Sequence, residues 1–337
     1  PTPSLAPRSF TDKLRDVPGT AARAAKTGLL QAKQAYAFLA AAGGADTWDT
    51  IAATRKGMRG IQTPDAVREM SEAETAGGAL KALARDPANA LAHLLVSSGV
   101  SFGMTAMPAI LAGRAAGGAA GGAIAAAGGA AIPAPEEVVT VPAGVLTGQA
   151  VGQGIGSGMG SFLLESTGEF LDALEKAGVD TADPQALRAA WADPKLKAHA
   201  RTLALKKGVP VAVFDALSAG TAGIWTRAAR KAGRGITAPA LKELVLLQVP
   251  AGMAGEAAGQ VVQSGKITRP GDVLAEGIAE LPGGAVEIAT GAMPSRKTAK
   301  TAPRSSATPP PLPTSMPALL TDAEIRVVAD TPDIARE

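Results

Sequence analysis

Glycine recurs at every fourth position through the middle of this chain, which strongly limits how that segment can fold. The repeat runs through Gly144, Gly148, Gly152, Gly156 and Gly160, and an earlier one through Gly113, Gly117 and Gly121. On an α-helix, residues four apart form one ridge, and a ridge without side chains lets a second helix approach closely. Glycine inside a helix costs up to about 1 kcal/mol relative to alanine. Aligned glycines therefore need a compensating contact, and the spacing predicts a helix-packing zipper.

Two other interpretations of this segment remain open at the level of the sequence. Gly154 and Gly158 add a strict alternation to the four-residue repeat, which a flexible glycine-rich loop would also produce. Close packing inside a soluble protein is the other alternative. A weaker echo of the repeat follows at Ala251, Gly255 and Gly259.

The apolar content favours closely packed helices over an ordinary globular core. Hydrophobic residues make up 46% of the chain, but aromatic residues only 3%, and 40 residues are glycine. Small side chains bury little area each, at about 25 cal/mol per Å². We therefore predict an all-α protein. We expect an extended helical assembly with Gly/Ala-rich hydrophobic hairpins rather than a compact single globular domain.

The distribution of charge divides the chain into four regions. We expect an N-terminal amphipathic helical arm (1–86), Gly/Ala-rich membrane-interacting helices (87–164), a helical packing region (165–292), and a Pro/Ser-rich linker with a short terminal helix (293–337). In the second region only Arg114, Glu136 and Glu137 are charged. Each uncharged stretch reaches the roughly 20 residues that a membrane-spanning helix needs. We expect one helix to end near Gly113, a second over 115–132 and a third over 143–164.

Start and stop signals place further helices. Gly43-Gly44 and Gly178 are typical helix ends, and Lys206-Lys207-Gly208 favours another. The pairs Asp86-Pro87, Asp183-Pro184 and Asp193-Pro194 join a capping side chain to a first-turn proline. These signals predict a helix over 20–42, and apolar helices over 209–231 and 238–263.

The sequence offers little material for catalysis. Cysteine is absent and there are only two histidines, His93 and His199, far apart in the chain. We find no metal-ligand spacing, nucleophile elbow or phosphate loop, so we expect no enzyme activity, cofactor or metal. Glu165, Glu169, Asp172 and Glu175 follow one helix, where a solvated face is favoured over acid–base chemistry. Arg227, Arg230, Lys231 and Arg234 form a basic cluster that could contact phosphate or lipid headgroups, or form a solvated helix end.

Three stretches resemble the internal virion proteins of phages, also called ejection or core proteins, and the very long phage polyvalent proteins. They are residues 148–180, 192–223 and 254–284, which join a Gly/Ala zipper to acidic amphipathic helices. The resemblance implies a homo-oligomer that contacts other virion proteins and the host membrane. It implies a place in the virion interior or core, then in the host cell envelope, with non-specific contact with DNA during ejection through a conduit.

Two other functions fit the same residues. A soluble helical scaffold or capsid-associated protein would use the zipper without entering lipid. A pore-forming toxin or effector would use glycine-zipper hairpins, although no receptor or translocation domain is evident. The resemblance makes the ejection protein our leading hypothesis.

Overall fold

The structure, a computed structural model, describes residues 10–129, 137–221, 229 and 237–292. Every regular element within these residues is helical, so the predicted all-α class is confirmed. The elements are α1 (Phe10–Ala42), α2 (Trp48–Arg59), α3 (Asp65–Ser71), α4 (Ala76–Arg85), α5 (Pro87–Gly129), α6 (Glu137–Lys176), α7 (Pro184–Ala192), α8 (Pro194–Thr221), α10 (Thr237–Glu243), the π-helical segment η1 (Leu244–Gln248), α11 (Val249–Ser264) and α12 (Pro270–Ala292). The expected terminal helix lies outside the described residues.

Several of the predicted helix ends are confirmed by their local geometry. The Asp183 carboxylate accepts from the backbone N–H of Gln185 at 2.9 Å, at the start of α7. Asp193 accepts from the N–H of Lys195 at 2.8 Å, at the start of α8. Gly44 and Gly178 have φ values of +94° and +87°, a left-handed conformation that glycine adopts without strain.

Three predicted interruptions are wrong, because the helix continues through each of them. Helix α5 passes Arg114 without a break, and the Arg114 guanidinium donates to Gln153 Oε1 on α6 at 3.1 Å. Residues 115–129 of the expected separate helix over 115–132 are thus the last third of α5, and residues 130–132 lie outside the described residues. Helix α8 likewise continues past Gly208, whose open face lies against the Phe162 ring. Helix α1 begins at Phe10 and includes Pro18 rather than starting after it.

Four of the ten aromatic residues form one cluster that joins α1, α2, α6 and α7. The Phe38 and Phe170 rings lie 5.0 Å apart, as do those of Trp48 and Trp191. Leu171 and Leu174 are buried beside them. A second cluster around Met70 joins α3 and α4 to α5 and α12. Residues 10–86 are therefore packed against the rest of the described protein.

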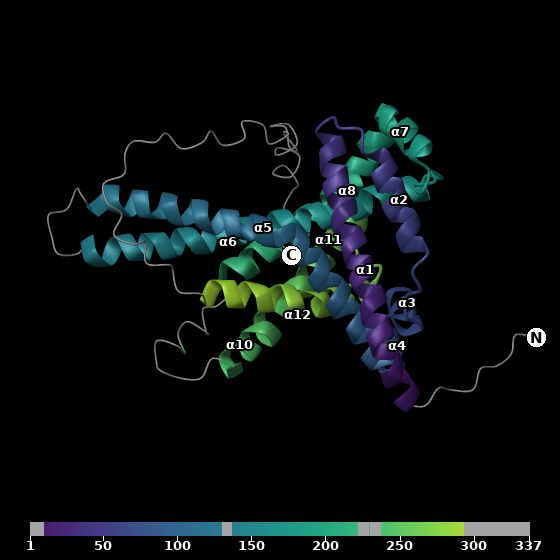
Figure 1. The fold of residues 1–337 in the computed structure, drawn as a ribbon, viewed down its shortest axis with the longest axis horizontal. Coiled ribbons are helices and arrows are strands. Elements are labelled where there is room, and N and C mark those ends of the chain that lie inside the picture. The colour runs from purple at the N-terminus through teal and green to yellow at the C-terminus, as the bar shows by residue number, and fades with distance from the viewer. Residues whose placement is uncertain (1–9, 130–136, 222–228, 230–236, 293–337) are drawn as a thin grey trace, which may run out of the picture.

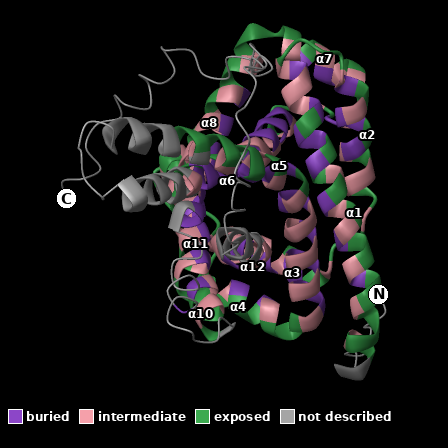
Figure 2. Ribbon diagram, turned by 60° about the vertical axis from the view of Figure 1, so that its left-hand side comes forward, coloured by how far each residue is buried: buried purple, intermediate pink, exposed green. Residues whose placement is uncertain are grey.

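Helices α5 and α6 leave this body side by side as a long hairpin (Figure 1). Helix α1 lies across the base of the hairpin, where the Tyr36 hydroxyl donates to the Met104 carbonyl at 2.8 Å. Buried residues gather where the helices of the body face one another, and exposed residues follow their outer sides (Figure 2). The arrangement leaves one end of the hairpin held by the body and the other end projecting.

Candidate functional site

Glycines form the contact between α5 and α6. A side-chain carbon added to Gly152 would collide with the backbone of Gly113. One added to Gly156 would lie 2.5 Å from the carbonyl carbon of Ala109, and one on Gly160 would lie 2.5 Å from the Cα of Ala106. The pairing runs in opposite directions along the two helices. The two backbones therefore approach so closely that only glycine fits.

Another glycine of α6 faces a different helix, which accounts for the alternation in the sequence. A carbon added to Gly158 would lie 2.6 Å from the Ala212 carbonyl oxygen on α8. Helix α6 is thus packed between α5 and α8, and the flexible-loop alternative for its glycine-rich part is wrong. In the weaker repeat on α11, Gly255 and Gly259 also pack on α8. A carbon added to Gly255 would lie 3.3 Å from Val211 Cα, and one added to Gly259 would lie 3.3 Å from Lys207 Cγ.

The remaining sequence-predicted positions are less fully described. Gly117 and Gly121 lie in α5, and Gly144 and Gly148 lie in α6. For these four glycines the structure describes the helix but not the atoms that they contact. The basic cluster of Arg227, Arg230, Lys231 and Arg234 lies outside the described residues.

The third side of α6 carries exposed apolar side chains. Val151, Ile155 and Met159 are 56%, 56% and 45% exposed, and their four-residue spacing puts them on one line, here called the outer stripe. Leu111 and Met104 of α5 are also exposed. The part of α5 from Pro87 to Gly117, with mean hydropathy 1.6, is the one described segment that is long and apolar enough to cross a membrane. The hairpin therefore combines a small-residue interior with an apolar exterior.

Hydroxyl groups between the helices are largely satisfied within their own helix. Thr105 donates to the Ser101 carbonyl at 2.8 Å, and Ser97 donates to the His93 carbonyl at 2.6 Å. Such bonds to the preceding turn satisfy the hydroxyl without a partner on another helix. These residues add little polarity to the hairpin.

The carboxylates of α6 do not form the solvated face expected from the sequence. Glu169 is buried, and its Oε1 accepts from Gln263. Arg55 of α2 donates from Nε to Glu175 Oε1 at 2.9 Å and also pairs with Asp172. Burial opposes ionisation of Glu175, but hydrogen bonds from Arg55, Thr181 and Arg59 lower its pKa to about 2. This face instead holds α2 against α6.

A second group of acids surrounds Lys207, which the sequence placed at a helix end. Lys207 Nζ lies 3.2 Å from Glu165 Oε2 and 3.4 Å from Glu256 Oε2, joining α6, α8 and α11. Burial raises the pKa of Glu256, and it raises the pKa of Asp215 to about 7. Burial and the nearby Glu165 also raise the pKa of Glu276. Carboxylates thus outnumber cations in this part of the interior.

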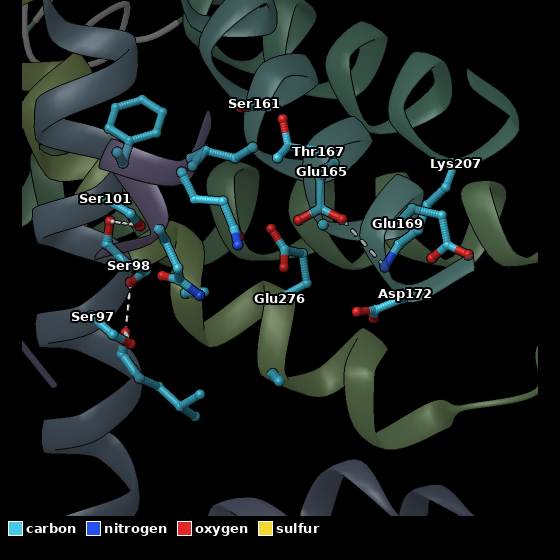
Figure 3. A pocket seen from close by; sticks show the side chains of 18 of the residues that line it. Ser97, Ser98, Ser101, Ser161, Glu165, Thr167, Glu169, Asp172, Lys207 and Glu276 are labelled. Carbon is cyan, nitrogen blue, oxygen red and sulfur yellow. Dashed lines mark hydrogen bonds and ion pairs between the residues drawn. The ribbon is translucent and has the colours of Figure 1, made fainter. Parts of the chain in front are cut away.

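A cavity of about 410 Å³ lies beside these acids. Its walls come from α1, α2, α5, α6, α8 and α12. They are mostly polar, and include Gln31, Gln34, Arg55, Ser97, Ser98, Ser101, Ser161, Glu165, Thr167, Glu169, Asp172, Lys207, Glu276 and Glu280. The carboxylates of Glu165 and Glu276 point toward one another across it, and Lys207 pairs with Glu165 (Figure 3). Among the described residues no group of acidic or histidine side chains has metal-binding geometry.

Sequence reasoning missed this cavity because its walls come from six separate helices. The only local signal was the row of carboxylates on α6, and that row fits a solvated face equally well. Glu256, Glu276 and Lys207 each stand in Ala/Gly-rich or mixed segments, where nothing marks them as buried.

The geometry of the hairpin and the cavity carries the functional argument. No protein-family model, curated protein or solved structure matches this chain.

Proposed function

We propose that this chain is a structural protein of the phage ejection type, whose α5–α6 hairpin enters the host membrane as part of an oligomeric conduit for DNA. The observation that carries the proposal is the hairpin itself, with glycine contacts inside and an exposed apolar stripe outside. Charge is absent from residues 87–113 and 138–164, which form most of its length. The proposed role is structural, with no cofactor.

The packing inside the hairpin suits a lipid environment. In lipid, helices gain little from burying apolar side chains against each other, so close backbone contact at small residues supports their association. The contacts of Gly152, Gly156 and Gly160 with α5 are of this kind. Arg114 would cost about 2.5–3.5 kcal/mol at the centre of a span. Its hydrogen bond to Gln153 supports placing both residues inside the hairpin seam.

The lengths of the two helices support two crossings. Beyond the contact with α1 at Met104, the part of α5 from Ala106 to Gly129 extends about 36 Å, and the facing part of α6 from Glu137 to Gly160 also extends about 36 Å. Both exceed the roughly 30 Å of a hydrocarbon core. A hairpin that crosses twice keeps both of its ends, and hence the body of the protein, on one side of the membrane.

Further exposed apolar residues support an oligomer. Val213 and Leu217 of α8 and Leu241 of α10 are exposed by 51%, 64% and 60%. Copies of the chain, other virion proteins and lipid are the partners that we propose for these surfaces and the outer stripe. Contact of the basic cluster with DNA or headgroups belongs to the same proposal, as does the move from virion core to host envelope.

Flotation of the full chain with lipid vesicles tests the proposal. We expect the protein to float, and protease treatment to leave a protected fragment that contains α5 and α6. Replacing Val151, Ile155 and Met159 with serine should abolish flotation without unfolding the protein. Leu80→Ser, at an exposed apolar residue of α4 that lies outside the hairpin, is the matched control and should float normally.

Either of two results would overturn the proposal in favour of another function. A chain that stays in solution with every vesicle composition, while folded, would favour the soluble scaffold. Mass spectrometry of purified virions before and after DNA release provides the second test, because an ejection protein must be present before release and depleted afterwards. Absence from virions, combined with leakage of vesicle contents, would favour the pore-forming toxin.

A further inference from the structure

A second cavity, of about 230 Å³, lies on the body of the protein where α1, α6, α7 and α8 meet. It shares no lining residue with the polar cavity beside Lys207. Four of the ten aromatic residues of the chain line it, namely Phe38, Phe162, Phe170 and Trp191. A chain with so few aromatic rings thus places a large share of them around one hollow, here called the aromatic pocket.

The rings of the aromatic pocket are held in place but remain within reach of a ligand. Phe38, Phe162 and Trp191 are half-buried rather than fully enclosed. The centre of the Phe38 ring lies 5.0 Å from that of Phe170 and 6.0 Å from that of Trp191. Contacts of this kind between rings fix their orientation, so the wall is formed before any ligand arrives.

Small side chains keep the aromatic pocket open. Ala42 of α1, Ser166 of α6 and Ala204 of α8 line it between the rings. Protein interiors contain few voids larger than a water molecule, so a hollow of this size between four packed helices is uncommon. A concave surface of half-buried rings is typical of a site that binds an apolar group.

The charge of the lining indicates which apolar group would fit. Among the described residues that line the pocket, Lys197 and Arg201 of α8 are basic and none is acidic. The Lys197 ammonium lies 4.8 Å from the centre of the Trp191 ring and makes no ion pair with any described residue. Arg201 has an interaction of its own within the protein. Lys197 therefore offers N–H donors and a positive charge to an anion beside the rings.

We propose that the aromatic pocket binds a small carboxylate with an apolar body, such as an aryl-substituted or short-chain fatty acid. The body packs against the rings, and the carboxylate accepts hydrogen bonds from the Lys197 ammonium. The volume is just below the roughly 300–1,000 Å³ of sites for drug-sized ligands, which limits the occupant to a small molecule. The pocket lies apart from the outer stripe, so this site does not depend on the proposed membrane role.

Titration of the full-length protein with 3-phenylpropionate and with octanoate, followed by calorimetry and by tryptophan fluorescence, tests the site. We expect saturable binding of at least one acid, with a rise in the melting temperature and a change in emission that Trp191→Phe reduces. The tighter of the two acids shows whether the pocket prefers an aromatic or an aliphatic body. The amine 3-phenylpropylamine has the same ring but the opposite charge, and it should not bind.

Three variants separate the charge from the space. Lys197→Met keeps the length of the side chain, removes its charge and should weaken binding of the acids by about 10-fold, the effect of losing one charged hydrogen bond. Lys195→Met, at an exposed lysine of α8 outside the lining, should bind like the unmodified protein. Ala42→Leu fills part of the pocket from the end of α1 and should abolish binding while the protein stays folded.

Several results would overturn the site. Failure of both acids to bind the folded protein would do so directly. Equal affinity for the acid and the amine, or unchanged binding in Ala42→Leu, would also do so, because either result would indicate partition onto apolar surface rather than a charged pocket. The titration is made without lipid, so the result of the flotation experiment does not bear on it.

Discussion

Substituting Gly156 with alanine tests how close the two hairpin helices lie. The new methyl group would lie 2.5 Å from the Ala109 carbonyl carbon and 2.6 Å from the Ile110 nitrogen. Both atoms belong to the backbone of α5, so neither can rotate away, and the helices must separate by roughly an ångström. Overpacking of this kind costs about 1–3 kcal/mol, and a clash with backbone belongs at the upper end. Alanine is favoured over glycine inside a helix by about 1 kcal/mol. The net loss in the free energy of unfolding is therefore about 2 kcal/mol.

Gly168→Ala on the same helix is the matched control. An added carbon at Gly168 meets nothing within 4 Å, so only the gain of up to about 1 kcal/mol in helix propensity remains. In a protein of 337 residues, 1 kcal/mol shifts the melting temperature by about 1–2 °C, because the entropy of unfolding is about 2.1 cal/mol/K per residue. Thermal unfolding followed by circular dichroism should therefore show a melting temperature lower by about 2–4 °C for Gly156→Ala and higher by about 1–2 °C for Gly168→Ala. Shifts of the same sign and size in both variants would refute the close contact.

Two further predictions concern the body of the protein. Burial raises the pKa of Asp215 to about 7 in the folded protein, above its ordinary value of 3.8, so its contribution to stability is fully present below pH 3.8 and is lost as the pH rises through 7. Asp215→Asn should therefore raise the melting temperature more at pH 8 than at pH 5, and an equal effect at both would contradict this. Phe170→Ala, at the centre of the aromatic cluster, should lower the free energy of unfolding by about 3–5 kcal/mol in urea titrations, whereas a loss below 1 kcal/mol would show that the cluster does not hold α1, α6 and α7 together.

Local chemistry in the sequence determined the helical class and many of the helix ends. A capping carboxylate followed by proline starts a helix wherever it stands, as at Asp183 and Asp193, because the bonds it makes reach only two or three residues along the chain. The left-handed glycines Gly44 and Gly178 end helices for an equally local reason. The four-residue glycine spacing likewise indicated a helix with one smooth ridge, since a ridge is a property of a single helix.

Tertiary structure decided which helix each ridge meets and which charges are buried. The spacing alone does not say that Gly156 faces α5 while Gly158 faces α8. Arg55 and Asp172 are 117 residues apart, and no local signal indicated that they pair. Lys207 resembled the end of a helix until Glu165 and Glu256, from two other helices, surrounded it. The free energy of a charge depends on whatever folds around it, so burial turned an apparently solvated row of acids into the wall of a cavity.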